Sequence, residues 1–589
     1  MTKILALLLL AASTALAQDN LQNDDRNWVL AAKDYAQTRF SRLNQINAGN
    51  AGRLQVAWTF SVGSNHGQEA APLVVNGVMY VVGAYPNELF ALDAATGEMK
   101  WKYSPHVDPS SQGVACCDVV NRGASYDDGK IFYNTLDNHT VAIDAKTGKE
   151  VWVTQLGDIS KGQTLTMAPL VAHGKVFVGN SGGEMGIHGW VTALDEKTGK
   201  IAWRGYSIGP DKDVLIGSRF HPYYADAKGR DLGMKTWPNG RWKYGGGPVW
   251  GWISYDPKTN LIFYGTGNPG PWNSNQREGD NKWTAAIFAR DADTGQVVWI
   301  DQLNPHDLWD YDEINENLLL DLPINGKTTP VLVHPGRNGF MYVIDRATGQ
   351  IYSADKYDTQ TSVLRIDLKT GRPVENQALH PSLGKNVTGV CPASPGAKDW
   401  QPTAYSPQTH LLYIPHQHLC MDYKTSQATY IPGTPYVGAT VNMYAGPGHY
   451  RGEFAAWDLT KRQKVWAIHE KFPVWTGTLV TAGNIAVYGT MDRWFKVVDA
   501  RSGKLLYQFR CPSGFIGQPI TYQGSDGRQY IAMLSGVGGW AGALANAEID
   551  PRVRNGALGY TGAVNDLPAV TSGGSVLMVF ALPKTGGAP

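Results

Sequence analysis

The chain of 589 residues is 43% hydrophobic and 17% charged, and its 52 basic and 51 acidic residues leave a net charge of +1. This balance, without a basic block, argues against a nucleic-acid partner and against a polybasic membrane patch. A chain of this length usually divides into several domains, because single cores seldom exceed about 250–300 residues, but radial repetition of one unit is an exception.

The N-terminal segment has the pattern of a cleaved secretory signal peptide. Lys3 precedes an apolar run over residues 4–10, and the small-residue site at 15–17 precedes Gln18. The run is too short for a membrane anchor, and no later stretch reaches about 18 uninterrupted apolar residues. We therefore predict that residues 1–17 are removed on export and that the mature protein, residues 18–589, has no membrane span.

A unit of the form A-x-D-x-x-T-G-x-x-x-W recurs along the chain. Clear copies occupy residues 91–101, 142–152, 193–203 and 289–299, and weaker copies begin at 343, 456 and 497. Alternating apolar residues lead into each copy, Asp-x-x-Thr-Gly makes a tight turn, and alternation resumes toward Trp, which predicts a β-hairpin.

The spacing of these hairpins predicts the architecture. A period of about 40–55 residues with four short strands per repeat is typical of a β-propeller. Two gaps of double length leave room for one degenerate copy each, for instance at 254–265, and the segment 54–58 has the pattern of a closing strand. We predict an all-β, eight-bladed β-propeller forming a single domain over residues 18–589. The repeats alone fit an open solenoid or a non-catalytic envelope scaffold equally well.

Adjacent cysteines, Cys116 and Cys117, interrupt the repeats within the stretch GVACCDVVNRG. A bond between neighbouring cysteines closes a strained eight-membered ring, which few folds would keep for stability alone. Such a pair offers a flat sulfur surface that suits packing on a planar ring. The alternatives are two unrelated thiols or pairing with distant cysteines.

A second departure is the stretch GGGPVWGW, where glycines allow close backbone approach before Trp250. A buried Trp usually belongs to the core. Beside a vicinal disulfide, however, Trp250 is predicted to form the other wall of a slot for an aromatic cofactor.

Oxygen donors form the third departure. Glu184 follows a glycine pair, Asn268 lies in a turn, and Asp310 and Asp312 flank a tyrosine. Each could singly be a turn or solvated residue. Together, three carboxylates and an amide suit a hard cation better than zinc or copper. A bound cation would also explain two like charges on one face of an extended segment.

The motifs CCDVVNRG, GNSGGE, WGW, YGTGNP, PHDLWDYD and KDWQP occur in the order found in one enzyme family. Over essentially the whole mature chain, the sequence resembles the pyrroloquinoline quinone (PQQ) dependent alcohol dehydrogenases, and among these the methanol dehydrogenase large subunits. The resemblance implies an eight-bladed propeller with tryptophan-docking motifs.

The resemblance also implies roles for individual residues. It makes Asp310 the catalytic base, assisted by Arg337, and Glu184 and Asn268 metal ligands beside the quinone. Asp312 stands where calcium-type members usually carry a small residue, which resembles the lanthanide-dependent branch. Further implied quinone contacts are Glu69, Arg122, Thr166, Ser181, Gly182, Gly183, Arg337, Asp399, Trp475 and Trp540, in addition to Cys116, Cys117 and Trp250.

Three positions remain to be assigned. Pro248 departs from the threonine common in methanol dehydrogenases, so a side-chain hydrogen bond to the cofactor is expected to be absent. Cys391 and Cys420 match the family's second disulfide. Cys511 is then unpaired, as either a buried thiol or a surface thiol capable of intermolecular bridging.

The function implied by the resemblance is periplasmic oxidation of methanol or another short primary alcohol to an aldehyde, by hydride transfer to PQQ assisted by a lanthanide ion. The sequence has no Cys-x-x-Cys-His haem motif, so a separate c-type cytochrome is the expected electron acceptor. The family also suggests a homodimer. The alternatives are a calcium-dependent PQQ alcohol dehydrogenase, another quinoprotein acting on sugars or polyols, and the non-catalytic scaffold.

Overall fold

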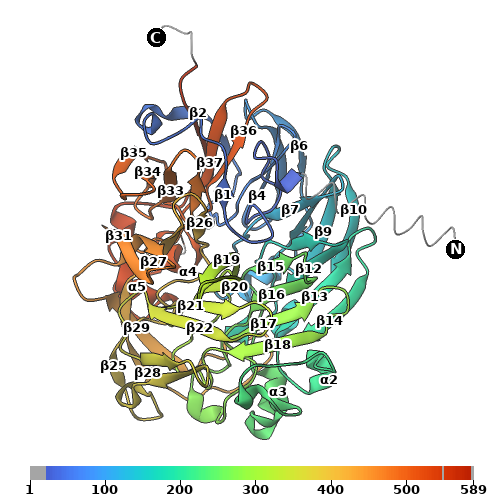
Figure 1. The fold of residues 1–589 in the computed structure, drawn as a ribbon, viewed down its shortest axis with the longest axis vertical. Helices are drawn as coiled ribbons and strands as arrows, with labels where there is room; N and C mark the ends of the chain where they lie inside the picture. Colours follow the sequence, from blue (N-terminus) through green and yellow to red (C-terminus); the bar gives the residue numbers. More distant parts are fainter. Residues whose placement is uncertain (1–20, 547–548, 585–589) are drawn as a thin grey trace, which may run out of the picture.

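The structure, a computed structural model, describes residues 21–546 and 549–584, and the signal-peptide prediction for residues 1–17 lies outside this range. Within these residues the strands form ten sheets, eight of which have four or five strands. In Figure 1 these sheets follow one another in chain order around a common centre. In the described part of the chain, four short α-helices lie among the connections: α2 (Asp211–Val214), α3 (Leu232–Lys235), α4 (Gly539–Gly542) and α5 (Tyr560–Val564).

Five sheets each use four consecutive strands. The first contains β3 (Leu73–Val75), β4 (Val78–Val82), β5 (Leu89–Asp93) and β6 (Met99–Tyr103). The second contains β7 (Ala124–Asp127), β8 (Lys130–Asn134), β9 (His139–Asp144) and β10 (Glu150–Gln155). The third contains β11 (Leu170–Ala172), β12 (Lys175–Gly179), β13 (Trp190–Asp195) and β14 (Ile201–Tyr206). The fourth contains β15 (Ile253–Asp256), β16 (Leu261–Gly265), β17 (Ala286–Asp291) and β18 (Val297–Gln302). The fifth contains β19 (Leu318–Ile324), β20 (Lys327–Pro335), β21 (Phe340–Asp345) and β22 (Ile351–Lys356).

The other three large sheets combine strands that are distant in sequence. One contains β26 (Ala404–Ser406), β27 (Leu411–Gln417), β30 (Gly452–Asp458) and β31 (Gln463–Glu470). The next contains β32 (Leu479–Thr481), β33 (Ile485–Gly489), β34 (Trp494–Asp499) and β35 (Leu505–Arg510), with β1 (Phe40–Ser41) parallel to β32. The last contains β36 (Ile520–Gln523), β37 (Gln529–Ser535), β38 (Val576–Ala581) and β2 (Gln55–Ser61). Antiparallel pairing of β2 with β38 confirms the predicted closing strand.

The two long gaps between repeats contain insertions, and the prediction of degenerate copies within them was wrong. The hairpin at 254–265 belongs to the same sheet as the copy at 289–299, because β16 pairs with β17. The second gap holds two small sheets, β23 (Val363–Asp367) with β24 (Arg372–Glu375), and β25 (Val387–Val390) with β28 (Leu419–Thr425) and β29 (Ala439–Ala445). Similar turns join β15 to β16 and β23 to β24, so the turn pattern does not by itself count sheets.

In several of the large sheets the first strand is buried and the last strand is more exposed, which places the first strand nearer the centre. β3 is entirely buried, whereas β6 alternates between exposed and partly exposed residues. β11 and β14 show the same contrast. The inner strands of neighbouring sheets contact one another, as β3 does β7 and β7 does β11. Loops from every sheet can therefore meet near the centre.

The repeated Trp and Gly explain how one sheet is fixed to the next. The Trp101 indole donates from Nε1 to the Ala145 carbonyl at 3.3 Å, and its ring lies against Gly148 in the following sheet. Equivalent contacts join Trp152 to Gly199, Trp203 to Gly295, Trp299 to Gly349 and Trp466 to Gly503. The Trp58 ring on β2 also lies against Gly97, although its Nε1 has no hydrogen-bond partner, so the closing strand shares the ring-on-glycine packing.

The structure shows the pairing of the three cysteines other than Cys116 and Cys117. Cys391 and Cys420 form a disulfide, as the family resemblance implied. Cys511 is a buried thiol, which decides between the two alternatives left open by the sequence.

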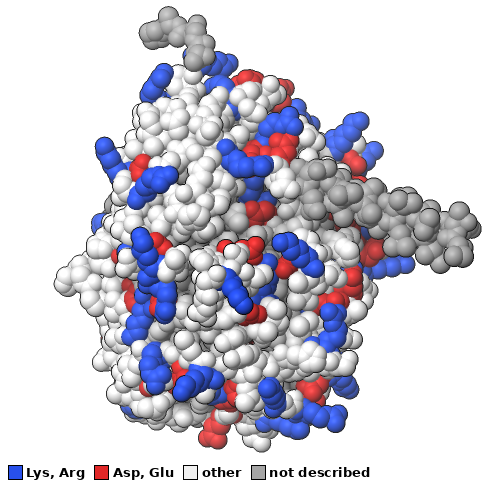
Figure 2. Space-filling model, in the orientation of Figure 1, with Lys and Arg blue, Asp and Glu red and all other residues white. Residues whose placement is uncertain are grey.

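The outer surface has no single-sign block of charge on the face drawn in Figure 2, where basic and acidic side chains are interspersed. Among the described residues, no helix has the length and apolar character needed to cross a membrane.

The Trp–Gly contact predicts a specific difference between two glycine variants. Gly148 and Gly174 both have φ of +71°, but a Cβ at Gly148 would lie 2.7 Å from the Trp101 ring, whereas Gly174 faces open space. Both alanine variants bear the left-handed backbone cost of about 1–2 kcal/mol. Gly148→Ala should add about 1–3 kcal/mol of overpacking. We expect a lower thermal unfolding midpoint for Gly148→Ala than for Gly174→Ala; equal midpoints would contradict the docking role of the contact.

Candidate active site

One cavity collects nearly all of the predicted site residues. Its lining contains residues from position 69 to position 558, so it is built by loops of many sheets. The predicted residues that line it are Glu69, Cys116, Cys117, Arg122, Thr166, Ser181, Gly182, Gly183, Glu184, Trp250, Asp310, Asp312, Arg337, Asp399, Trp475 and Trp540. Asn268 does not line the cavity itself and contacts it through Asp312.

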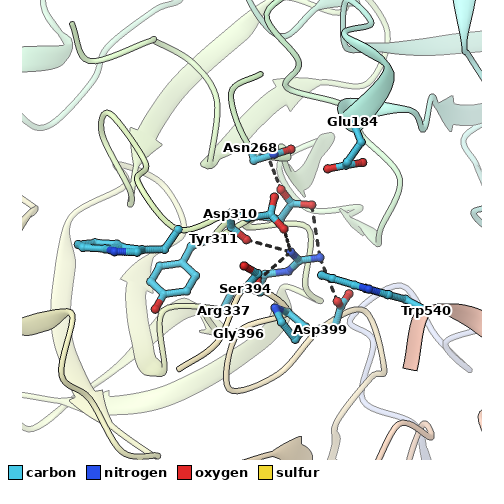
Figure 3. Close-up of polar contacts among 12 residues, drawn as sticks. Glu184, Asn268, Asp310, Tyr311, Arg337, Ser394, Gly396, Asp399 and Trp540 are labelled. Atoms are coloured by element: carbon cyan, nitrogen blue, oxygen red, sulfur yellow. Dashed lines mark hydrogen bonds and ion pairs between the residues drawn. The ribbon is translucent and has the colours of Figure 1, made fainter. Parts of the chain in front are cut away.

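Arg337 lies at the centre of three carboxylates, those of Asp310, Asp312 and Asp399, which we call the acidic group (Figure 3). Its Nη2 is 3.0 Å from Asp399 Oδ2 and 3.4 Å from Asp312 Oδ2, and its Nη1 is 3.6 Å from Asp310 Oδ2. Nη1 also donates to the Asp310 carbonyl at 3.0 Å. All four side chains are buried, so the single guanidinium offsets part of the repulsion among three carboxylates.

The acidic group still carries more negative charge than Arg337 can neutralise. Burial, followed by the charges of Asp312 and Glu184, raises the pKa of Asp310 well above its usual range. Burial likewise raises the pKa of Asp312 to about 7, against the opposing effect of Arg337. The group is therefore destabilised when fully ionised, unless another cation joins it.

Asp312 connects the metal-ligand candidates to the predicted stacking indole. Its Oδ2 accepts from Trp250 Nε1 at 2.9 Å, and its Oδ1 accepts from the Asn268 backbone N–H. A Cβ added to Gly183 would lie only 2.9 Å from Asn268 Oδ1. A glycine at 183 thus permits the loop that carries Glu184 to approach Asn268.

Glu184 follows Gly182, whose φ of +118° strongly favours glycine. In Figure 3 its carboxylate points toward the Asn268 and Asp310 side chains. The ligand atoms of Glu184, Asp310 and Asp312 are not all within 4.8 Å of one another. Within the described part of the chain, the one group of three His, Cys, Asp or Glu ligand atoms with that spacing is Cys116, Cys117 and Glu184.

The residues present fit a hard cation. Asp310 Oδ1 is buried and has no hydrogen-bond partner, which is costly for a carboxylate oxygen. The surrounding donors are carboxylate and amide oxygens from Glu184, Asn268 and Asp312, the type that calcium-like ions prefer. A large cation would satisfy the orphaned oxygen and reduce the repulsion at once.

Asp307 was missed as a site residue, although it belongs to the same acidic stretch. Its Oδ2 accepts from the backbone N–H of Asp310 and Tyr311 at 3.0 and 3.1 Å, and its Oδ1 accepts from Trp309 N–H at 3.1 Å. Asp310 has φ of +70°, so the expected extended backbone at this position was wrong. Asp307 holds the left-handed turn that orients the candidate base Asp310. An Asp three residues before the candidate base was the sequence signal for this turn, because Asp side chains often accept from the backbone N–H groups that follow them.

Another part of the cavity lining is a network of hydrogen-bonded polar side chains that suits an anion. Arg122 Nη1 donates to Thr166 Oγ1 at 2.7 Å, and Thr166 Oγ1 lies 2.8 Å from Ser181 Oγ. Arg122 Nη2 pairs with Glu69 Oε2 at 2.9 Å, and its guanidinium lies 4.8 Å from the Trp250 ring centre. Arg122 Nε and Trp475 Nε1 are buried without partners, so donors remain for the carboxylates of a quinone cofactor.

The predicted bond between Cys116 and Cys117 is not formed in the structure. Both are free thiols with sulfurs 2.7 Å apart, on the wall of the cavity. Ring closure between neighbouring cysteines is strained, so proximity alone does not make the bond. Pro248, the departure from the family pattern, packs against Gly183 and Gly267 and does not line the cavity.

Several lining residues were not predicted individually, among them Asp118, Thr164, Trp272, Trp400 and Leu558. Asp118 directly follows the cysteine pair, and Trp400 directly follows Asp399, so their motifs gave a signal for both. The Trp400 ring centre lies 4.9 Å from the Arg122 guanidinium. Leu558 and Thr164 are ordinary residue types, and only the tertiary structure identifies them.

Comparison with known proteins supports the same family. The family model described as "PQQ: Glucose/ethanol/alcohol dehydrogenase, beta-propeller domain" matches residues 28–354 and 451–531 of the chain. The chain is 48% identical to the lanthanide-dependent methanol dehydrogenase of Methylacidiphilum fumariolicum, covering 98% of this chain and 97% of that protein. It is 43% identical to methanol dehydrogenase (cytochrome c) subunit 1 of Methylobacterium organophilum, covering 99% and 96%.

A solved structure of a europium-containing methanol dehydrogenase superposes with a TM-score of 0.94 at 49% identity, covering 96% of this chain and 99% of that one. These matches confirm the family resemblance and the all-β propeller architecture. Taken with the cavity, they establish that the chain belongs to the family of PQQ-dependent alcohol dehydrogenases, in its methanol dehydrogenase branch.

Proposed function

We propose that this protein is a periplasmic enzyme that oxidises methanol or another short primary alcohol to the aldehyde, using PQQ and a lanthanide ion. The observation that carries the proposal is that Glu184, Asp310 and Asp312 line one cavity beside Arg337, where the buried Asp310 Oδ1 has no hydrogen-bond partner. The names of the similar proteins support methanol and a lanthanide as substrate and ion.

The proposed architecture is one propeller with the eight large sheets as its blades, formed by residues 18–589 after removal of residues 1–17. The Trp–Gly contacts between successive sheets support this reading as tryptophan docking. A homodimer is proposed from family resemblance. A separate c-type cytochrome is proposed as electron acceptor, since a relative carries cytochrome c in its name.

When bound, PQQ supplies the hydride acceptor, and the cation supplies a Lewis acid that polarises it. Glu184, Asn268, Asp310 and Asp312 would hold the cation, and Arg122, Thr166 and Ser181 would hold the cofactor's carboxylates. Trp250 and the Cys116–Cys117 pair would contact its ring.

Asp310 would act as general base toward the alcohol. With the cation bound, a lone pair of the Asp310 carboxylate that the ion does not use would take the hydroxyl proton, while Arg337 keeps the backbone and carboxylate of Asp310 in position. Burial of the group excludes water and strengthens the attraction between Arg337 and the carboxylates.

The extra carboxylate is the argument for a lanthanide over calcium. Asp312 adds one negative charge next to Asp310, which suits a trivalent ion, while each of its oxygens retains a lone pair after accepting its hydrogen bond. Calcium is the alternative ion, and it would leave more of the repulsion uncompensated.

Reconstitution tests the activity. The full chain with PQQ and lanthanum should reduce an artificial dye when methanol is added, and calcium alone should give less activity. Asp310→Asn should bind PQQ but lose about 10² to 10⁴ in rate, because the general base is absent. Equal activity with calcium would remove the lanthanide from the proposal, and no alcohol-dependent dye reduction with either ion would refute the function.

Asp312 provides a separate test of the ion. Asp312→Ala should abolish lanthanide-supported turnover, because it removes a ligand and the acceptor for Trp250 Nε1. Asp312→Asn keeps a side-chain acceptor but not the charge, so it serves as the matched control. Full activity in Asp312→Asn would show that hydrogen bonding suffices and that the charge is not needed. Turnover and bound lanthanum per chain are measured together.

Asp307 is predicted to be a positioning residue. Asp307→Asn replaces an oxygen that accepts backbone hydrogen bonds, so the turn at Asp310 should shift and kcat should fall by about 10²-fold, as for small misplacements of reacting groups. Bound PQQ per chain should not change. The control is Asp321→Asn, an exposed acid of the same stretch that does not line the cavity. A rise in KM without a fall in kcat would argue against a role for Asp307 in positioning the base.

A further inference from the structure

The closest group of potential metal ligands in the described residues combines two thiols with one carboxylate. The sulfurs of Cys116 and Cys117 are 2.7 Å apart, and Cys116 Sγ lies 3.3 Å from Glu184 Oε2. All three ligand atoms lie within 4.8 Å of one another. They line the same cavity as the acidic group around Arg337, and Glu184 is also one of the candidate oxygen donors.

Both segments that carry these ligands are fixed by backbone contacts. Asp118, next to the cysteine pair, has φ of +77°, and its Oδ2 accepts from the backbone N–H of Gly67 and Gly539 at 3.2 and 2.9 Å. The Glu184 carbonyl accepts from the Tyr436 backbone N–H at 2.6 Å. These contacts hold the two segments side by side and keep the three ligand atoms close to one another.

The chemistry of this set differs from that of the oxygen set. Thiolates are soft ligands that favour zinc-like ions, whereas carboxylate and amide oxygens favour calcium-like and lanthanide ions. Binding of a divalent ion by two thiols releases two protons, because the thiolate is the ligand.

We propose that, when Cys116 and Cys117 are reduced, they form with Glu184 a site for a thiophilic divalent cation such as Zn²⁺ or Cd²⁺. An ion held there occupies Glu184 and part of the cofactor cavity, and it excludes the hard cation; this consequence rests on the proposed function, whereas the binding itself does not. Oxidation of the pair to a disulfide removes two electrons and two protons and eliminates both soft ligands. The redox state of the pair thus selects the class of metal that the cavity accepts.

Titration of the full chain with Cd²⁺, in the absence of PQQ and alcohol, tests the proposal. One sample is reduced with a phosphine, and the other is oxidised with glutathione disulfide, which takes up the two electrons and two protons. Calorimetry and the ultraviolet thiolate-to-cadmium absorption report binding. We expect one Cd²⁺ per reduced chain with the thiolate absorption, and loss of that absorption in the oxidised chain.

Three variants identify the ligands. The double variant Cys116→Ser, Cys117→Ser should abolish the thiolate absorption. Glu184→Gln should weaken Cd²⁺ binding by at least about 10-fold to 100-fold, which is the loss seen when a residue that only hydrogen-bonds to a metal ligand is removed. Cys511→Ser, which changes a buried thiol outside the cavity, is the control and should bind Cd²⁺ as the unchanged chain does.

Equal Cd²⁺ binding by the reduced and oxidised chains, or unchanged affinity in Glu184→Gln, would overturn the proposal. Because neither cofactor nor alcohol is present, these outcomes leave alcohol oxidation untouched. Conversely, a chain that fails to oxidise alcohol can still bind Cd²⁺ as proposed. A final arm adds La³⁺ to the reduced chain with and without Cd²⁺; the expected result is that bound Cd²⁺ lowers La³⁺ uptake.

Discussion

The cavity depends on the electrostatic balance around Arg337. Three buried carboxylates, on Asp310, Asp312 and Asp399, share one guanidinium at 3.0–3.6 Å. Removing charges from water is costly, and a single guanidinium cannot neutralise all of them. The remaining negative charge makes the cavity receptive to a cation and keeps the candidate base poised beside it. Asp312 also accepts from Trp250 Nε1, and this bond ties the indole to the loops that carry the candidate metal ligands.

The scaffold makes this concentration of charge possible. Six tryptophans on outer strands each pack on a glycine of the next sheet, so these sheets are fixed to one another at the periphery. The short inner strands then bring loops from distant parts of the chain to one centre. Acids separated by more than a hundred residues, such as Glu184 and Asp310, can be held together because many independent contacts share the cost.

Metal choice and redox state are linked through one residue. Glu184 lies beside the oxygen donors and also 3.3 Å from the Cys116 sulfur. Soft and hard donors compete for the same space, so the state of the cysteine pair bears on which ion the cavity holds. This gives the adjacent cysteines a consequence for metal selection in addition to their place on the wall of the cavity.

The sequence alone determined the periodic and local features. Hairpin spacing predicted the propeller architecture, and adjacent cysteines, paired acids and glycine-rich turns predicted part of the lining of the cavity, because each leaves a pattern within a few residues. The family resemblance implied other lining residues, such as Glu69, Arg122 and Asp399. The tertiary structure decided the rest. It showed that the long gaps hold insertions, that Asp307 fixes the left-handed turn at Asp310, and that Leu558 reaches the cavity. These depend on contacts between segments far apart in the chain, and a single sequence carries no local record of such contacts.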